Sequence, residues 1–418
     1  MKIYDFAVIG GGIAGISIAE ILTREGHSVI LIDKNDKLSS ETTREFHEWL
    51  HTGSLYTLIP GQKNVLRFIL GAIDDLLEFY SSYERMNITP TNSGLKINES
   101  NNKSWFNKNF IDFKYKVKNR KFALPWIYGI ARSIYLIEKI HTHDWLRRRA
   151  GEFKHFKKGR TKRVFNLFKE ILFSNDVFKT VETSDFTINS RLLLRDLLET
   201  SIQNGLEISL SNSISDILNY KNYKLIKGSK EIFYAKKVAL CDGDGINKFS
   251  DVKTKLSYAP IGIVSGLPTK SKSFVELDYF TKNCINLLIK DNGIGLVGGI
   301  SLSNLNKCDD YLDYVIEKHK TYQPNIKELD RYNGKKTEIT FKNADRGYLY
   351  HIVNNSENIW SLIPGKFTLA FSMAPEFYRR VFKKNPKKTF KTFLATEKST
   401  KIVSNTYWMD TYLKKNKK

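Results

Sequence analysis

The sequence predicts an α/β protein that opens with a Rossmann-like nucleotide-binding unit. A short apolar strand, Phe6 to Ile9, runs into the segment GGGIAG, which has the G-x-G-x-x-G spacing. A helix-like stretch follows, and then a second apolar strand, Val29 to Ile32, which ends at Asp33. The 418 residues, 41% of them hydrophobic, suffice for roughly two to three domains with buried cores. Strand, glycine turn, helix, second strand and terminal acid together favour a βαβ unit over an ordinary tight turn.

Three glycines carry the nucleotide prediction. Gly10 permits the tight turn from strand to helix, Gly12 lets the backbone approach a pyrophosphate, and Gly15 lets the helix pack closely on the strand. Ile13 and Ala14 then begin the helix, where backbone N–H groups and the helix dipole favour the negative charge of phosphates. We therefore expect this turn to hold the diphosphate of an adenine-containing coenzyme.

The acid that ends the second strand narrows the choice of coenzyme. Asp33 lies 18 positions beyond Gly15. A carboxylate at this place accepts hydrogen bonds from an adenosine ribose and repels a 2′-phosphate. We therefore expect a coenzyme whose ribose carries free hydroxyls.

Cysteine usage and hydropathy indicate the compartment. Cys241, Cys284 and Cys308 are odd in number and widely spaced, so the sequence indicates neither a disulfide framework nor a zinc site. No apolar run reaches the ~18 residues of a membrane span, and the N-terminus lacks the layout of a secretory signal. We expect a protein of the reducing cytoplasm.

Several further segments resemble one family, in the family's order. After Asp33 comes SSETTREFHEWLHTGSLYT, with a His-x-Gly-x-x-Tyr motif at His51, Gly53 and Tyr56. TINSRLLLRDLLETSIQNGLEI, KKVALCDGDGI and NIWSLIPGKFTLAFSMAPEF follow it along the chain. The sequence resembles the FAD-dependent oxidoreductases of the D-amino-acid oxidase (DAO) superfamily, most closely the branch with glycerol-3-phosphate and L-2-hydroxyglutarate dehydrogenases. The resemblance implies that FAD is the cofactor.

The resemblance also implies how the chain is divided. The family interleaves a Rossmann-like FAD-binding domain of the GR2/DAO type with an α+β substrate domain. The FAD-binding domain would comprise residues 1–95, 181–260 and 356–418, the last with a basic C-terminal tail. The substrate domain would comprise residues 96–180, with basic helices, and residues 261–355, with a sheet.

Cofactor contacts are assigned from the glycine turn and from the family segments. The predicted FAD-binding residues are Gly10, Gly12, Ile13, Ala14, Gly15, Asp33, Lys34, Thr42, Thr43, Gly243, Gly365, Lys366, Phe367 and Thr368. The turn after Leu240 departs from the family, because Asp242 and Asp244 would place two acids near a pyrophosphate unless they point away.

Three residues are predicted to act on the substrate. His51 matches the family's histidine, and its ordinary pKa near neutrality suits a base that removes a hydroxyl or amine proton. Arg346 would grip a carboxylate or phosphate with paired hydrogen bonds, although a solvated arginine fits equally. Lys366 would stabilise a reduced, anionic flavin. His47 and Glu48 do not indicate a metal, because no third ligand is apparent.

The charge of the chain is strongly positive and uneven. The chain carries 67 Lys+Arg against 44 Asp+Glu, a net charge of +23. From Lys114 to Glu170, 17 residues are basic and 4 are acidic. This segment fits peripheral contact with an anionic membrane at its inner face, a cap that attracts an anionic substrate, RNA binding, or a merely solvated face. Nucleic acid is the least favoured of these partners, because no RNA-binding signature accompanies the charge.

These observations lead to one functional prediction with two alternatives. The sequence predicts a flavoenzyme that transfers a hydride from the CH–OH group of a small anionic substrate, such as a hydroxy acid, a polyol phosphate or a sugar derivative. Oxidation of a CH–NH group in an amino acid or amine on the same fold is the first alternative. A flavin-dependent RNA-modifying protein, favoured only by the charge, is the second.

Overall fold

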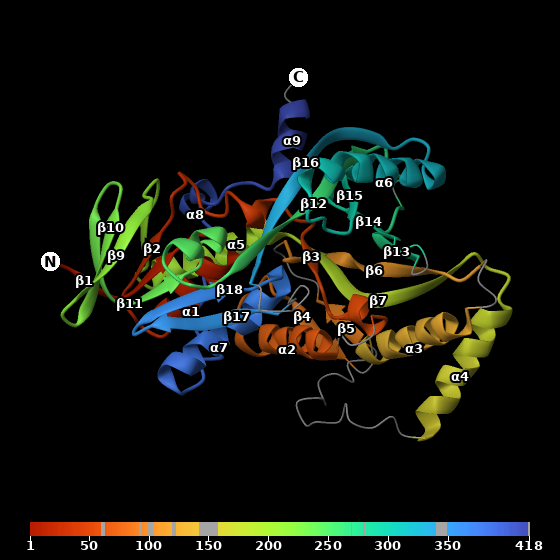
Figure 1. Cartoon of the computed structure of the whole chain (residues 1–418), viewed down its shortest axis with the longest axis horizontal. Coiled ribbons are helices and arrows are strands. Elements are labelled where there is room, and N and C mark those ends of the chain that lie inside the picture. Colours follow the sequence, from red (N-terminus) through yellow and green to blue (C-terminus); the bar gives the residue numbers. More distant parts are fainter. Residues whose placement is uncertain are drawn as a thin grey trace.

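Two large mixed sheets lie side by side along the long axis of the molecule, with helices packed on their faces (Figure 1). Each sheet has 8 strands. The computed structural model describes the chain apart from residues 60–62, 92–93, 99–102, 119–122, 142–157, 269, 279–280, 282, 340–348 and 417–418.

The first sheet contains the predicted βαβ unit. Its order is β17-β18-β11-β1-β2-β8; in addition, β10 pairs with residues 232–235 of β11, and β9 pairs with β10. Strands β8, β2, β1, β11 and β18 are parallel to one another. The strands of this sheet are β1 (Ile3–Ile9), β2 (Val29–Ile32), β8 (Glu207–Ser209), β9 (Ile214–Tyr220), β10 (Tyr223–Gly228), β11 (Ile232–Leu240), β17 (His351–Ser356) and β18 (Ile359–Ile363).

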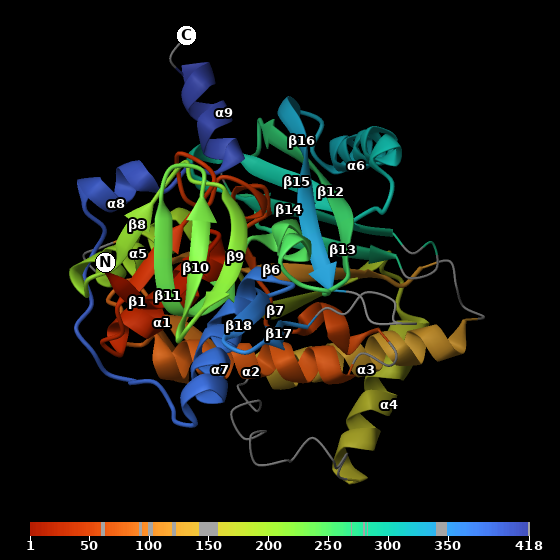
Figure 2. The ribbon, with the colours of Figure 1, turned by 60° about the vertical axis from the view of Figure 1, so that its left-hand side comes forward.

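Apolar side chains cover both faces of the first sheet. Along β1, Phe6 and Val8 pack against the helices, whereas Ala7 and Ile9 point to the opposite face, as the alternation of a strand requires. The β9–β10 hairpin extends over that opposite face, as Figure 2 shows. The helices on the first face are α1 (Ile13–Arg24), α2 (Lys63–Phe79), α5 (Ser190–Gln203) and α7 (Ala370–Phe382).

The second sheet runs in the order β16-β12-β15-β14-β13-β6-β7-β3. Alternating residues of one strand face different helices: Phe274 packs with the α6 cluster, and Val275 and Leu277 with the α3 cluster. The strands are β3 (Trp49–Leu50), β6 (Phe106–Lys116), β7 (Phe178–Ile188), β12 (Thr254–Ser265), β13 (Phe274–Asp278), β14 (Asn283–Ile289), β15 (Gly295–Gly299) and β16 (Lys327–Ile339). The helices are α3 (Leu124–His141), α4 (Lys158–Phe173) and α6 (Cys308–Tyr322).

The remaining elements connect and cover the two sheets. A small hairpin pairs β4 (Ile88–Thr91) with β5 (Gly94–Ile97), and α8 (Glu397–Ile402) and α9 (Tyr407–Asn416) close the chain. Trp408 of α9 packs on the second sheet. The segment boundaries expected after residues 95, 180, 260 and 355 each fall inside a strand, namely β5, β7, β12 and β17.

Candidate active site

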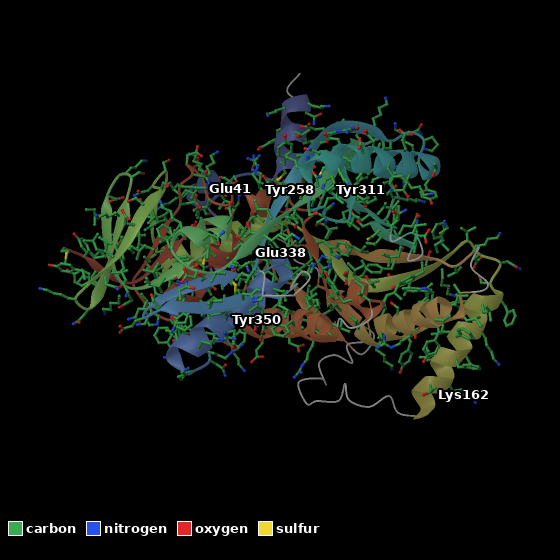
Figure 3. All side chains as sticks on the ribbon, viewed as in Figure 1. Glu41, Lys162, Tyr258, Tyr311, Glu338 and Tyr350 are labelled. Carbon is green, nitrogen blue, oxygen red and sulfur yellow. The ribbon has the colours of Figure 1, made fainter. Side chains whose placement is uncertain are left out.

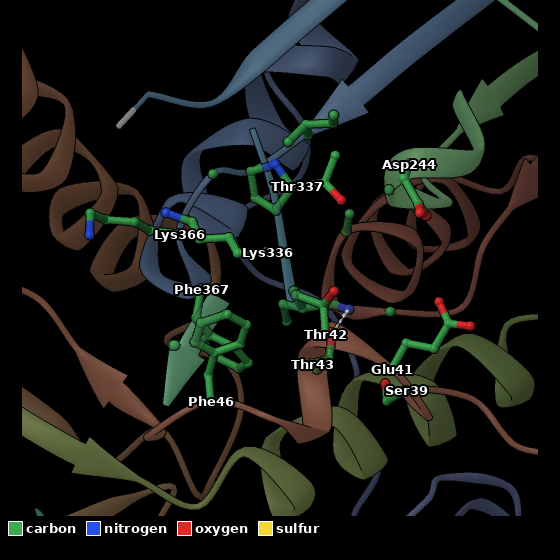
Figure 4. A pocket seen from close by; sticks show the side chains of 18 of the residues that line it. Ser39, Glu41, Thr42, Thr43, Phe46, Asp244, Lys336, Thr337, Lys366 and Phe367 are labelled. Carbon is green, nitrogen blue, oxygen red and sulfur yellow. Dashed lines mark hydrogen bonds between the residues drawn. The ribbon is translucent and has the colours of Figure 1, made fainter. Parts of the chain in front are cut away.

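A cavity of about 830 Å³ lies where the two sheets meet. Its size is in the range of about 300–1,000 Å³ that is usual for small-molecule and cofactor sites. Figure 4 shows Glu41 and Asp244 on one side of this cavity and Lys336, Lys366 and Phe367 on the other. One side of the cavity is therefore acidic, and the opposite side is basic and aromatic.

The glycine turn forms one wall of the cavity as expected. Gly10 has φ +99°, and a Cβ atom there would lie 2.7 Å from the backbone of Asp242. A Cβ atom on Gly15 would lie 1.8 Å from the carbonyl oxygen of Gly10, so only glycine lets α1 approach β1 this closely. Gly12 is the N-cap of α1 and no acidic residue occupies the first turn. The helix start is therefore ready to receive an anion.

Asp33 is held rigidly at the end of β2. Its Oδ2 accepts a hydrogen bond from the Gly11 N–H (2.6 Å), and its Oδ1 accepts one from the Asn35 N–H (2.8 Å). Burial raises the pKa of this carboxyl, and the two hydrogen bonds oppose that shift. Asp33 lines the cavity. Lys34 forms an ion pair with Glu41 (2.7 Å), and both side chains are about half exposed.

Two threonines close the cavity against the start of α1. The hydroxyl of Thr43 accepts a hydrogen bond from the Ile13 N–H (3.1 Å), and Thr42 begins a short 3-10 turn that ends at Arg44. Both threonines line the cavity (Figure 4). The guanidinium of Arg44 pairs with Asp410 (2.8 Å).

The altered glycine turn after β11 brings its acids to the cavity. Gly243 has φ +66°, and it lines the cavity together with Asp242 and Asp244. Burial raises the pKa of Asp242 to about 7. Asp242 Oδ1 is buried and accepts no hydrogen bond. The two acids of this turn therefore do not point away from the cavity.

His51 lies on the basic side of the cavity. Its ring stacks on Trp49 with centroids 4.0 Å apart, and its backbone N–H donates to the hydroxyl of Thr368 (3.0 Å). Burial lowers the pKa of His51 well below its ordinary 6.5, and the charges of Lys366 and Lys336 lower it further. The imidazole is therefore neutral at pH 7 and able to accept a proton.

The C-terminal glycine loop reaches the same wall. Gly365 has φ +65°, and a Cβ atom there would lie 2.6 Å from the carbonyl oxygen of Leu349. Gly365, Lys366 and Phe367 line the cavity, and the ammonium of Lys366 lies over the ring of Tyr56 at 5.1 Å.

Most of the predicted site residues meet in this one cavity. Two of them, Gly15 and Thr368, lie behind its wall: the first packs α1 on β1, and the second holds the backbone of His51. Arg346 lies outside the described residues. The predicted residues that line the cavity are Gly10, Gly12, Ile13, Ala14, Asp33, Lys34, Thr42, Thr43, His51, Gly243, Gly365, Lys366 and Phe367.

The structure adds residues that the sequence did not single out. Lys336 of β16 lines the cavity and forms an ion pair with Glu338 (2.5 Å). Asp185 of β7 lies 4.0 Å from His51 Nδ1. No local signal marks either residue, since each is brought to the site by strand pairing.

Glu48, which the sequence places beside His47, forms a buried ion pair with Lys290 (3.0 Å). Within the described part of the chain, no three His, Cys, Asp or Glu side chains gather as metal ligands.

The glycine cradle, the helix start free of acids and the acid that ends β2 define a dinucleotide-binding protein. The model of the DAO family, described as FAD dependent oxidoreductase, matches residues 5–266. The chain therefore belongs to the DAO family of FAD-dependent oxidoreductases. It is an enzyme with FAD as its cofactor, and the predicted family, α/β fold class and cofactor are confirmed.

Solved structures share the fold over nearly the whole chain. FAD-bound, dithionite-reduced L-α-glycerophosphate oxidase from Mycoplasma pneumoniae is 14% identical, with a TM-score of 0.63, and the match covers 98% of this chain and 100% of that one. Glycine oxidase from Geobacillus kaustophilus is 12% identical (TM-score 0.63, 95% and 99% covered). L-Proline dehydrogenase from P. horikoshii is 13% identical (TM-score 0.61, 92% and 95% covered). At these identities the likeness concerns the fold alone.

Among the helices of the described residues, none combines the length and the apolar character that crossing a bilayer demands.

Proposed function

We propose that this enzyme oxidises the CH–OH group of a small anionic substrate, such as a hydroxy acid, a polyol phosphate or a sugar derivative. The supporting observation is the charge beside His51, where Lys336 and Lys366 line the cavity and both disfavour protonation of the imidazole. Both ammonium groups attract a carboxylate or phosphate, although that of Lys336 is shared with Glu338 (2.5 Å), and they repel the ammonium that an amino acid carries at neutral pH. A hydroxy acid carries no ammonium group, so it is not repelled by the two lysines.

The cofactor occupies the glycine-lined side of the cavity in this proposal. Bound FAD supplies the acceptor for a hydride and its two electrons. The turn from Gly10 to Gly15 and the amides of α1 hold the diphosphate, while Asp33 bonds the ribose. Further contacts come from Ile13, Ala14, Lys34, Thr42, Thr43, Gly243, Gly365, Lys366 and Phe367. Thr368 acts indirectly, by holding His51.

The protein's own part in the reaction is to bind the substrate and move one proton. Lys336 and Lys366 hold its anionic group, and the apolar side chain of Leu55 in the cavity lining limits the access of water. His51, neutral and fixed by stacking on Trp49, takes the hydroxyl proton. The same carbon loses its hydride, so both electrons of the C–H bond leave and a carbonyl product remains.

A second candidate is oxidation of a CH–NH group on the same site. Structures that share the fold are named glycine oxidase, L-proline dehydrogenase and an unusual amino acid oxidase. A fold does not fix a substrate, so these names are weaker evidence for the substrate class than Lys336 and Lys366 beside His51. Flavin-dependent modification of RNA rests on net charge alone and is the weakest candidate.

Anaerobic flavin reduction separates these candidates. The FAD-loaded protein is mixed with glycerol 3-phosphate, 2-hydroxyglutarate and lactate in one series, and with glycine and L-proline in another, while flavin absorbance is followed. We expect bleaching in the first series. Bleaching by the amines alone overturns the CH–OH assignment, and protection of a bound RNA with no bleaching in either series favours the third candidate.

A peripheral membrane contact through the basic segment also belongs to the proposal. Helix α4 projects from the second sheet and carries Lys162 (Figure 3). Phe165 and Phe173 are 50% and 77% exposed on the same helix, and Trp126 of α3 is 39% exposed. Exposed aromatic and basic side chains on one helix pair suit the surface of an anionic bilayer.

Vesicle sedimentation tests this contact. We expect the protein to sediment with vesicles that contain phosphatidylserine, and not with pure phosphatidylcholine vesicles. Replacing Phe165 and Phe173 by serine should weaken sedimentation, whereas replacing Leu218, which is 45% exposed on the distant β9, should not. Equal recovery of the protein with both kinds of vesicle would count against the contact.

A further inference from the structure

A buried carboxylate lies directly behind His51. Asp185 is 0% exposed on β7, and its oxygens accept hydrogen bonds from the indole N–H of Trp49 (2.8 Å), the N–H of Thr52 (3.0 Å) and the hydroxyl of Ser54 (3.0 Å). The hydroxyl of Thr52 also donates to it. All the donors come from the short segment that carries His51. Asp185 therefore fixes this segment to the second sheet.

The donor set around Asp185 stabilises its ionised form. Burial raises the pKa of this carboxyl, and the hydrogen bonds from Thr52, Trp49 and Ser54 oppose the rise. The indole N–H and the backbone N–H can only donate, so a protonated carboxyl would face donors where it needs an acceptor. We take Asp185 as a carboxylate for this reason.

The surroundings of His51 disfavour a positive charge on its ring. Burial and the charges of Lys366, Lys336 and His47 all oppose protonation of its ring. The ring of Tyr56, another titratable group, stands 6.5 Å away between ring centroids. Asp185 Oδ2 lies 4.0 Å from His51 Nδ1, and this nitrogen is buried with no hydrogen-bond partner. A base that gains positive charge here gains it next to Asp185.

We propose that Asp185 is a positioning residue for His51. At 4.0 Å it makes no hydrogen bond to the ring and acts through its charge: it favours the Nδ1–H form of the neutral imidazole, which leaves Nε2 to receive the hydroxyl proton, and it balances the imidazolium that results. The step conserves protons: the substrate hydroxyl loses one, His51 gains one, and His51 later releases it to solvent. The role in proton transfer rests on the proposed function, whereas the placement of the resting proton does not.

The first test is spectroscopic and needs no substrate. The whole FAD-loaded protein is labelled with ¹⁵N-histidine, and the ring signals of His51 are assigned by their loss in His51→Gln. We expect a neutral ring with its proton on Nδ1. A neutral ring with its proton on Nε2, or a ring charged at neutral pH, overturns the proposal.

The second test compares two substitutions near the same carboxylate. Asp185→Asn removes the negative charge, and Ser54→Ala removes one donor but keeps the charge. With the best substrate found, we expect Asp185→Asn to slow flavin reduction at least about tenfold and to move the pH profile of His51 to lower pH. KM should stay within about twofold, because Asp185 is not part of the cavity lining.

The outcomes are separable. Ser54→Ala should keep the wild-type pH profile, and a profile of Asp185→Asn that coincides with it would overturn the role of Asp185. If Asp185→Asn fails to fold or loses FAD, the spectroscopic test on the wild-type protein decides whether the proposal stands, because it shows which nitrogen of the neutral His51 ring carries the proton. A wild-type flavin that no hydroxy substrate reduces counts against the proposed function alone.

Discussion

The hydroxyl of Thr368 accepts a hydrogen bond from the backbone N–H of His51 at 3.0 Å, and so joins the C-terminal glycine loop to the candidate base. Thr368 is fully buried behind the cavity wall. The loop that carries Lys366 and the segment that carries His51 are therefore placed relative to each other by one hydroxyl group. The distance between His51 and the loop that carries Lys366 depends on this bond.

Thr368→Val tests the link, because valine keeps the shape and removes the acceptor. We expect a loss of about 1 kcal/mol in the free energy of unfolding and slower flavin reduction, since the His51 N–H loses its partner. Thr368→Ser keeps the hydroxyl and should retain most of the reduction rate. Denaturant unfolding and anaerobic reduction of both variants are the measurements. Valine and serine variants with equal rates would show that the bond does not position His51.

His51→Ala tests the base itself. We expect a yellow, folded protein whose flavin is reduced at least about a hundredfold more slowly by a hydroxy substrate. The cofactor should remain, because the predicted diphosphate contacts lie at the other wall. His27→Ala, which removes a histidine distant from the cavity, is the matched control. Reduction at the wild-type rate would exclude His51 from proton transfer.

The parts of this molecule that could be predicted from the sequence are those whose residue requirements lie within one short stretch of the chain. The Gly10 to Asp33 unit was predictable because its turn, helix and strand lie within one short stretch, each with its own residue requirement. His51 was found through a motif of neighbouring residues. Asp185 and Lys336 were missed, because β7 and β16 bring them to the site through pairing with strands remote in the chain. Asp242 and Asp244 are evident in the sequence, but whether their side chains point into or away from the cavity depends on tertiary packing.

Asp242→Asn should make FAD retention less sensitive to pH. The pKa of Asp242 is raised from 3.8 to about 7 by burial, then by Asp244 and Asp33, against the charge of Lys34. Because the folded pKa is the higher one, stability falls as the pH rises from 3.8 to about 7, and the carboxylate formed above this range also repels a diphosphate.

The measurement is the amount of FAD that remains bound to the protein after dialysis. We expect the wild-type protein to retain less FAD at about pH 8 than at about pH 6, and Asp242→Asn to retain it equally at both. Asp244→Asn, at an exposed position, should keep most of the wild-type dependence. Parallel losses from the wild-type protein and Asp242→Asn would place the diphosphate away from this turn.

Lys336→Met should separate substrate binding from the acidity of His51. Loss of one ammonium group removes an attraction for the substrate anion, so KM should rise at least about tenfold. It also removes a charge that opposes protonation, so the pKa of His51 should rise toward its ordinary 6.5. Steady-state kinetics and ¹⁵N titration of the ring report the two effects. Lys335→Met, at the exposed neighbouring position outside the cavity lining, should change neither. If both variants give the wild-type KM, the substrate anion is held elsewhere.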